Sequence, residues 1–376
     1  MFYATHACVD LAAIRRNLLA VRERVGGRQV MLAVKGNAYG HGAVEVSRMV
    51  ERTGCADRLA IATVPEGIEL REAGITLPIL KLSHCFEWEL EAALKADLVL
   101  TVVDELTIDQ ARGAAQRLGV TAKVHLKVDT GMRRIGTEPS QAEALVRWID
   151  ACPNLELEGI FTHPPVSDMA DETAYTVAEL TAFRELVDRI QAERGPIDLV
   201  HAAPSGVILA HDLAGTTAVR AGIMAYGYYP DASTPRTVAL EPAMSMVSRV
   251  TFVKQISAGE SVGYGRTWVA PRDTWIATVC VGYADGWSRR NTNTGRMLVG
   301  GRSYPVVGRV CMDQTMVDLG PEDPQVGVGD EVVLLGRQGD QVITADDLAA
   351  IMQTISYEVT CLITARVPRV YQDDEA

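Results

Sequence analysis

The 376-residue chain lacks the features that mark membrane and secreted proteins. It has no run of about 18 apolar residues, so we expect no membrane-spanning helix. Its amino terminus has no basic stretch followed by an apolar core, and its seven cysteines are odd in number and never form a C-x-x-C pair. We therefore expect reduced thiols, no structural metal and a cytoplasmic location.

Positive charge is also scarce, because 36 lysines and arginines stand against 48 aspartates and glutamates, which gives a formal net charge of −12. An acidic surface repels polyanions, so we expect no nucleic-acid partner, and any phosphate must be bound locally. Hydrophobic residues make up 48% of the chain and charged residues 22%. This composition is typical of soluble globular proteins, and the length suits two domains with a core each.

The first part of the chain alternates short apolar runs with longer segments of helical spacing. Eight strand-helix units of this kind predict a closed parallel barrel of the TIM type. An amphipathic helix is also predicted over residues 9–21, with Arg15, Arg16 and Asn17 on its solvent side. The predicted strands are 29–35, 58–64, 77–83, 98–103, 122–129, 155–162, 198–203 and 218–223, and helices between them include 44–53, 65–73, 87–95, 107–118, 140–151 and 173–192.

After Pro230 the pattern changes to β-rich runs divided by glycine. Such runs predict a second domain that is mainly β. We place the α/β barrel domain at residues 1–238 and the mainly β domain at 239–376. The predicted strands of the second domain are 244–256, 275–281, 297–319 and 329–335, followed by a helix over 345–353 and a last strand through residue 370.

Polar side chains stand at the carboxyl ends of five predicted barrel strands. Enzymes built on such barrels place their active sites at this end, so we expect these side chains to form one site. Each of them alone could instead be a surface or structural residue. They are Lys35, Lys127 with Asp129, His163, His201 with Ser205, and Arg220.

Lys35 ends the apolar run 31–34 and is followed by a glycine-broken polar turn. A lysine at the end of a buried strand is costly to hold charged, so we expect its pKa to fall and its neutral amine to form an imine with a carbonyl. Such an amine suits a pyridoxal cofactor. The nearby Tyr39 offers a phenol to a phosphate, and Gly36, Gly40 and Gly42 permit close backbone approach.

The stretch AVKGNAYGHGA around Lys35 resembles the cofactor-lysine segment of alanine racemases. Similar matches are VHLKVDTGMRRIG, SVGYG, VGYADGW, GRVCMDQTMVDLG and ISYEVTCLITARVPRVY, in register from about residue 5 to residue 371. The resemblance implies a fold-type III racemase that depends on pyridoxal 5′-phosphate and interconverts L-alanine and D-alanine. It also implies a role in supplying D-alanine for peptidoglycan.

The resemblance further implies which residues bind the cofactor. Lys35 would hold it covalently, His163 would stack on its ring, and Arg220 would face the pyridine nitrogen. An arginine stays protonated, because its pKa exceeds about 12, so it cannot readily receive a proton from the pyridine nitrogen or stabilise one there. The cofactor would then be a weaker electron sink than one paired with a carboxylate. The phosphate would be held by Tyr39, Ser205, Gly222, Ile223 and Tyr357.

Racemisation needs a second base on the face opposite Lys35, and Tyr264 matches the catalytic tyrosine of the family. A phenol with a reference pKa of about 10 needs help from cations or a hydrogen-bonded chain, for which His163 and Arg220 are candidates. The resemblance implies a homodimer in which each site takes its tyrosine from the partner chain. It implies substrate contacts from Arg134, Met312 and Tyr283, and carbamylation of Lys127, for which an unmodified lysine paired with Asp129 is the alternative.

Some positions depart from the family pattern. Pro164 and Pro165 follow His163, where Phe-Ala is usual, and Pro204 replaces an asparagine. Arg133 stands where glycine is common and could compete with Arg134. A serine or broad-specificity amino acid racemase, a non-catalytic pyridoxal phosphate-binding protein and a decarboxylase remain alternatives, although Arg220 argues against the last.

Overall fold

The computed structural model describes residues 3–373, and the chain divides into two compact units. One, here called the barrel unit, consists of Ala13–Ala38 and Gly42–Pro242. The other, here called the β unit, consists of the described residues up to Ala12, Tyr39–His41 and the residues from Ala243 onward.

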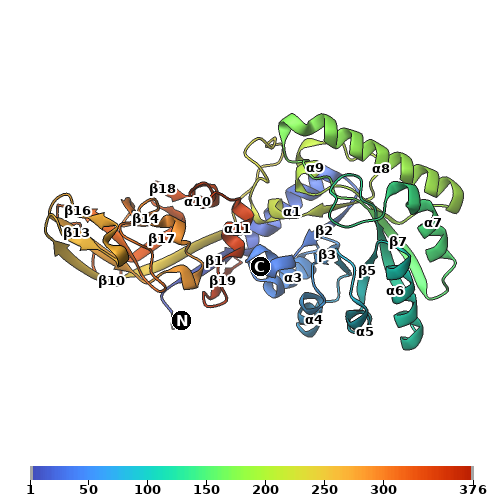
Figure 1. Ribbon diagram of the computed structural model, residues 1–376, viewed down its shortest axis with the longest axis horizontal. Helices are drawn as coiled ribbons and strands as arrows, with labels where there is room; N and C mark the ends of the chain where they lie inside the picture. The colour runs from blue at the N-terminus through green and yellow to red at the C-terminus, as the bar shows by residue number, and fades with distance from the viewer. Residues whose placement is uncertain (1–2, 374–376) are drawn as a thin grey trace. The chain divides into compact units, whose positions relative to one another are not determined.

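The described part of the barrel unit contains one eight-stranded parallel sheet in the order β8-β7-β6-β5-β4-β3-β2-β9, surrounded by helices (Figure 1). Two backbone hydrogen bonds join its first and last strands, Thr217 N–H to Val200 O at 2.9 Å and Arg220 N–H to Ala203 O at 2.8 Å. The predicted α/β barrel is therefore confirmed as nearly closed. Its strands are β2 (Gln29–Ala33), β3 (Arg58–Ile61), β4 (Ile79–Lys81), β5 (Leu98–Val102), β6 (Ala122–Lys127), β7 (Leu155–Phe161), β8 (Leu199–His201) and β9 (Ala218–Ala221).

The barrel helices follow the local signals in the sequence. For example, Asp104 accepts a hydrogen bond from Thr107 N–H at 2.8 Å and caps α6, whose carboxyl end is closed by Gly119 with φ of 68°. The six predicted helices are confirmed to within two residues at each end. The helices are α1 (Leu11–Val25), α3 (Ala43–Thr53), α4 (Val64–Glu72), α5 (Glu87–Lys95), α6 (Glu105–Leu118), α7 (Pro139–Asp150), α8 (Thr173–Arg194) and α9 (Ser205–Ala210).

The predicted amino-terminal helix was wrong in two respects. Residues 6–10 form strand β1 (His6–Asp10), so α1 begins at Leu11. Asn17 is not on the solvent side, because it is only 1% exposed. Its amide donates to Ala225 O at 3.1 Å and Glu241 O at 2.9 Å, and its oxygen accepts from Glu241 N–H at 2.8 Å. These three bonds offset the cost of burying the amide.

In the β unit, the 13-residue strand β10 (Met244–Ile256) pairs with three others. It pairs with β1, β13 and β17 in antiparallel register, while β1 also pairs in parallel with β19. The predicted run 297–319 is divided into three strands. The elements are β11 (Ser261–Val262), β12 (Trp268–Val269), β13 (Thr274–Val279), β14 (Arg296–Val299), β15 (Arg302–Pro305), β16 (Thr315–Gly320), β17 (Glu331–Gln338), β18 (Gln341–Ile343), α10 (Ala345–Met352), α11 (Ser356–Cys361) and β19 (Arg369–Gln372).

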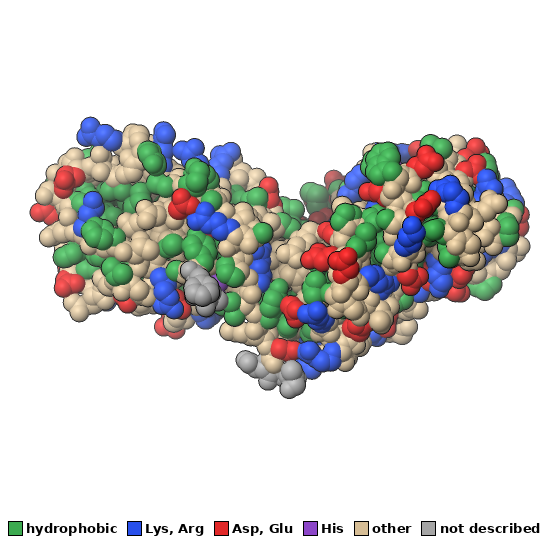
Figure 2. All heavy atoms as spheres, turned by 90° about the horizontal axis from the view of Figure 1, so that it is seen from below, with side chains coloured by type: hydrophobic (Ala, Val, Ile, Leu, Met, Phe, Trp, Pro, Cys, Tyr) green, Lys and Arg blue, Asp and Glu red, His purple; other side chains and the backbone are tan. Residues whose placement is uncertain are grey.

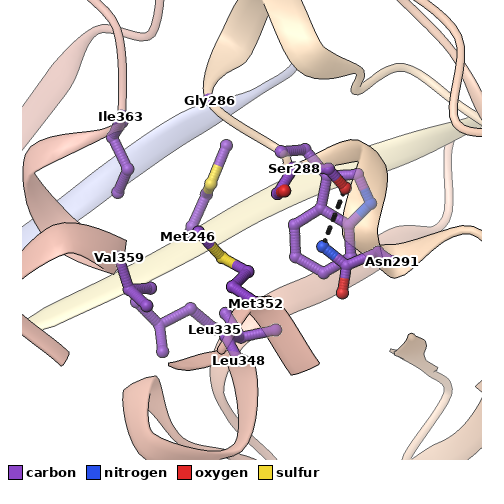
Figure 3. A pocket seen from close by; sticks show the side chains of 10 residues that line it. Met246, Gly286, Ser288, Asn291, Leu335, Leu348, Met352, Val359 and Ile363 are labelled. Atoms are coloured by element: carbon purple, nitrogen blue, oxygen red, sulfur yellow. Dashed lines mark hydrogen bonds between the residues drawn. The ribbon is translucent and has the colours of Figure 1, made fainter. Parts of the chain in front are cut away.

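A small cavity lies inside the β unit, but it is not the expected site. Its lining is mainly apolar and includes Met246, Trp287, Leu335, Leu348 and Val359 (Figure 3). None of the side chains proposed from the sequence for cofactor, substrate or catalysis lines it. It is therefore a packing gap in the core of this unit.

The charge pattern on one face and the apolar character of the helices agree with the composition. Acidic and basic side chains are interspersed on the face shown in Figure 2, so the net negative charge is not gathered there into a single patch. Within residues 3–373, no helix has both the length and the apolar character needed to cross a membrane.

Candidate active site

The segment that carries Lys35 has an unusual backbone. β2 ends at Ala33, and the next turn, α2 (Lys35–Tyr39), is left-handed, with φ of 61° at Gly36, 55° at Asn37 and 53° at Ala38. Each non-glycine residue in this region costs about 1–2 kcal/mol, and such strain is concentrated at functional sites. The sequence predicted a turn here but not its handedness, although glycine and asparagine are the residues that tolerate it best.

Hydrogen bonds hold this strained turn in place. Asn37 accepts from Gly42 N–H at its backbone oxygen, 2.9 Å, and from Ala43 N–H at its side-chain oxygen, 2.8 Å. The Glu66 carboxylate accepts from Gly36 N–H at 2.7 Å and from Ala62 N–H at 2.8 Å. Glu66 therefore ties the residue after Lys35 to the start of α4, which fixes where the lysine leaves the backbone.

Lys127 ends β6 and is surrounded by positive charge. It is 6% exposed, and its Nζ lies 5.4 Å from the centroid of the Phe161 ring. Burial, followed by the charges of Arg134, Arg220 and Lys35, lowers the pKa of Lys127 to about 7. A substantial fraction of this amine is therefore neutral near physiological pH.

The loop after β6 carries two arginines whose contacts differ. Asp129 accepts from Gly131 N–H and Arg133 N–H, each at 3.0 Å, which shapes the loop. Arg133 pairs with Glu138 at 2.7 Å on the surface. The Arg133 guanidinium therefore has a carboxylate partner on the surface, whereas Arg134 contributes to the positive charge around Lys127.

Arg220 lies on β9 and is 5% exposed. Its Nη2 donates to Thr162 O at 2.7 Å and lies 3.3 Å from His163 Nδ1, while its Nη1 lies 2.7 Å from His201 Nδ1. Because arginine only donates, both imidazoles accept through Nδ1. Burial and the charge of Arg220 hold the pKa of His163 well below its ordinary value, so this imidazole is neutral.

Ser205, Gly222 and Ile223 lie together where β8 and β9 end. The Ser205 hydroxyl oxygen accepts from Gly222 N–H at 3.1 Å, and Ile223 is fully buried. Tyr226 donates from its hydroxyl to Ala33 O at 2.8 Å, which links this turn to the end of β2. The turn is thus fixed relative to the strand that leads to Lys35.

In the β unit, the Tyr39 and Tyr357 rings lie with their centroids 5.9 Å apart. Tyr39 is 8% exposed, and burial raises the pKa of its phenol, so the hydroxyl is protonated and able to donate. Gly40 packs against α11, since a Cβ at this position would lie 2.1 Å from Thr360 O. Arg369 Nε donates to Gly40 O at 3.0 Å and completes this contact.

The Gly40 contact predicts a large loss of stability on substitution. Gly40→Ala combines a left-handed φ of +86° with a backbone clash, so we expect the free energy of unfolding to fall by about 3 kcal/mol or more. Gly74→Ala is a matched control, because Gly74 has φ of +89° and nothing within 4 Å of the added Cβ. Urea unfolding of both variants measures the difference. Equal losses would contradict a role for the Thr360 contact.

Tyr264 follows β11 and is 72% exposed. Its neighbours Gly263 and Gly265 both have φ of 72°. A Cβ on Gly265 would lie 3.1 Å from the Arg309 guanidinium carbon, so a cation is close to the backbone of this turn. The phenol therefore projects from a fixed turn of the β unit into space that the unit itself leaves open.

Tyr283 and Met312 lie on two segments that are joined to each other. Tyr283 N–H donates to Cys311 O and Ala284 N–H donates to Met312 O, both at 3.0 Å. Tyr283 is 42% exposed and Met312 is 52% exposed. The two side chains therefore stand on one stiff, accessible edge.

A set of residues that sequence reasoning missed supports this edge. Arg366 pairs with the fully buried Asp285 at 3.1 Å and with Asp313 at 2.6 Å, and it donates to the Tyr3 hydroxyl at 3.0 Å. Asp285 also accepts from Gly282 N–H at 2.9 Å. The only signal in the sequence was that Arg366 falls in the matched carboxyl-terminal segment, where its charge had no assigned partner.

The structure thus gathers the expected residues into groups. The barrel unit holds Lys35, Lys127, Arg134, His163, Ser205, Arg220, Gly222 and Ile223, at the carboxyl ends of its strands or in the segments that follow, here called the barrel mouth. The β unit holds Tyr39 with Tyr357, Tyr283 with Met312, and Tyr264 on its hairpin.

Comparison with known proteins shows the family to which the chain belongs. The model of the alanine racemase N-terminal domain matches residues 9–230, and the model of the alanine racemase C-terminal domain matches residues 243–371. The chain belongs to the alanine racemase family. An alanine racemase from Cutibacterium acnes is 54% identical over 98% of this chain and 97% of its own length.

Solved structures of alanine racemases are similar to this chain over nearly its whole length. An alanine racemase from Clostridium difficile has a TM-score of 0.93 at 35% identity, covering 100% of this chain and 97% of that one. One from Bacillus anthracis with bound L-Ala-P has a TM-score of 0.92 at 37% identity, with the same coverage. A histidine racemase from Leuconostoc mesenteroides is also similar, with a TM-score of 0.89 at 27% identity over 99% of both chains.

Proposed function

We propose that this chain is a pyridoxal 5′-phosphate-dependent alanine racemase that interconverts L-alanine and D-alanine. The observation that carries the proposal is the position of Lys35, at the end of a barrel strand and close enough to Lys127 for their charges to interact. The 54% identity to the Cutibacterium acnes alanine racemase supports alanine as the substrate. The proposed role is supply of D-alanine for peptidoglycan in the cytoplasm.

The barrel mouth fits a phosphorylated aldehyde. Lys35, Lys127, Arg134 and Arg220 interact electrostatically there, and burial and the charge of Arg134 lower the pKa of Arg220 from its ordinary value, so an anion would relieve their repulsion. When bound, pyridoxal phosphate draws electrons from the α-carbon of an attached amino acid. The proposed binding residues are Lys35, Tyr39, His163, Ser205, Arg220, Gly222, Ile223 and Tyr357.

The proton transfers are assigned to Lys35 and Tyr264, acting on opposite faces of the α-carbon. One takes the α-proton and the other delivers a proton. Tyr264 is 72% exposed in a single chain, which suits a phenol that completes the site of a second copy. We therefore propose a homodimer with composite sites, in which the barrel domain 1–238 binds the cofactor and the domain 239–376 supplies the second base.

Substrate binding is assigned to Arg134, Met312 and Tyr283. Arg134 and the Met312 N–H would bind the carboxylate, and Tyr283 would narrow the mouth. We propose that Lys127 is carbamylated, because its lowered pKa supplies the neutral amine that attacks carbon dioxide, forming an N–C bond and releasing a proton. The resulting anion would stand among cations and orient Arg134.

A racemase with a different or wider substrate range is the second candidate. The similarity to a histidine racemase shows that the same fold is used for a larger side chain. Pro164, Pro165 and Pro204 stiffen the loops after β7 and β8 and could change which side chains fit. The bulk of Tyr283 and Tyr357 favours a small side chain.

The deciding experiment compares racemisation of alanine, serine, histidine, lysine and arginine by the purified protein. We expect an absorbance band from the covalently bound cofactor and kcat/KM at least about tenfold higher for alanine, since each methylene or polar group that does not fit costs about 1–3 kcal/mol. A yellow protein inert toward both alanine enantiomers would instead support a non-catalytic cofactor-binding protein.

A further inference from the structure

Four polar side chains form a hydrogen-bonded series through the interior of the barrel unit. Arg220 Nη1 lies 2.7 Å from His201 Nδ1, His201 Nε2 lies 2.9 Å from His125 Nδ1, and His125 Nε2 lies 3.0 Å from Glu158 Oε2. All four side chains are at most 5% exposed, and both histidines are fully buried. Of the four, Arg220 alone is among the residues proposed to bind the cofactor.

The two ends of this series fix every proton in it. Arginine only donates, so His201 must accept at Nδ1 and carry its proton on Nε2. His201 then donates to His125 Nδ1, which leaves the His125 proton on Nε2, facing Glu158. An ionised carboxylate only accepts, so the series closes without an unpaired donor or acceptor.

The charges around the series agree with two neutral imidazoles. Burial is the main cause that lowers the pKa of His125 and holds the pKa of His201 well below its ordinary value. Burial alone would raise the pKa of Glu158, but hydrogen bonds from His125 and Arg58 outweigh it and lower the pKa to about 2. Arg58 binds both Glu158 oxygens, at 2.9 and 3.1 Å, and Lys123 donates at 3.1 Å.

Packing around the series restricts the His125 and His201 rings to one orientation each. His125 lies opposite Gly159 on β7, and a Cβ on Gly159 would lie 2.6 Å from His125 Cε1 and 2.8 Å from Leu199 O. His201 stacks on Phe161, with ring centroids 4.7 Å apart and planes at 6°. The rings therefore cannot turn to reverse their donors and acceptors without moving the strands.

We propose that Glu158 and His125 are positioning residues that hold His201 as a proton acceptor, and through it fix the orientation of Arg220. With Nη1 held by His201, Arg220 keeps Nη2 on Thr162 and His163 at the barrel mouth. Without the series, the His201 proton could move to Nδ1, where it would face the Arg220 donors. Arg220 would then lose the bond to Nδ1 and face a second donor, while its bonds to His201 O at 2.8 Å and Thr162 O at 2.7 Å remain. The guanidinium would shift, and under the proposed function the environment of the cofactor ring would change.

The first test is ¹⁵N NMR of the holoenzyme labelled at its seven histidines. Signals are assigned by their loss in His125→Phe and His201→Gln. We expect both His125 and His201 to be neutral with the proton on Nε2 from about pH 6 to pH 9, because burial disfavours the charged ring. An imidazolium, or a proton on Nδ1 of either ring, at pH 7 overturns the proposal.

The second test breaks the series without touching Arg220. Gly159→Ala crowds the His125 ring and Leu199 O but keeps all charges, and Glu158→Leu removes the acceptor without adding bulk at Gly159. Each should change the His201 signal, shift the cofactor absorbance and lower kcat about tenfold to 100-fold with less effect on KM, as for other groups that orient a functional side chain. Thr101→Val is the matched control, since Thr101 is a buried barrel-strand side chain bonded to Lys81 O and not to the series.

The expected tautomers do not depend on the proposed function, whereas the expected changes in cofactor absorbance and kcat do. Failure of the positioning role can therefore be distinguished from failure of the proposed function. Expected tautomers in a protein that does not racemise alanine would overturn the proposed function alone. Full activity with an unchanged His201 signal in folded Gly159→Ala and Glu158→Leu would overturn the positioning role alone.

Discussion

Under the proposed function, we expect Lys35→Ala to lower kcat for alanine racemisation by at least about 10⁴-fold and to remove the absorbance band of the covalently bound cofactor. The change removes both the covalent attachment and one of two proposed bases. The left-handed turn after Lys35 is held by Glu66 and Asn37, so the backbone should survive the substitution. The measurement is D-alanine formation from L-alanine, together with an absorbance scan of the purified variant.

Lys81→Ala is the matched control for this prediction. Lys81 also ends a barrel strand and is 4% exposed, but its amine donates to His84 O at 2.6 Å and to Ser83 O at 3.2 Å. Its loss should lower stability while the absorbance band and the racemisation remain. Activity of Lys35→Ala near that of the parent chain would end the assignment of Lys35.

The barrel could be predicted from the sequence because its signals are local. Strands buried on both faces give continuous apolar runs, and caps such as Asp104 mark the helices between them. The same logic placed Lys35, Lys127, His163 and Arg220 at one end of the barrel, since parallel strands all end at the same edge. Those positions needed only the order of elements.

Strand β1 could not be predicted in this way. Its partners are Met244 to Val247 and Arg369 to Gln372, more than 200 residues along the chain, and no local pattern encodes that pairing. Residues 9–21 carry helical spacing, so the helix was extended over the end of the strand. Asn17 was misplaced because its three hydrogen-bond partners lie at residues 225 and 241.

The buried polar groups of the site were the hardest to predict. His125 and Glu158 lie inside strands, where a polar residue normally marks the solvent face. Only the structure shows that Arg58 and Lys123 neutralise Glu158 and that Gly159 makes room for His125. Arg366 was missed because its partners Asp285 and Tyr3 are distant from it in the sequence.

Tyr264→Phe should lower racemisation by about 10²- to 10⁴-fold in both directions, because either direction needs one proton removed and one delivered. Lys35 should still exchange the α-proton of the enantiomer whose proton faces it. In heavy water, we therefore expect deuterium to enter the α-position of one alanine enantiomer but not the other. Tyr229→Phe is the control, since the Tyr229 hydroxyl donates to Val238 O at 2.8 Å within the barrel unit. Exchange lost, or retained, for both enantiomers would contradict the two-base assignment.

Mixing inactive chains tests whether Tyr264 serves a partner. If each site joins Lys35 of one chain to Tyr264 of another, refolding Lys35→Ala with Tyr264→Phe in equal amounts gives mixed dimers with one intact site and one doubly altered site. Random pairing then restores about a quarter of the parent activity, because half of the dimers are mixed and each has one working site. If both groups come from the same chain, the mixture stays as inactive as its parts. The exposed Tyr264 would then need another explanation, because the space beside it would not be filled by the active site of a second copy.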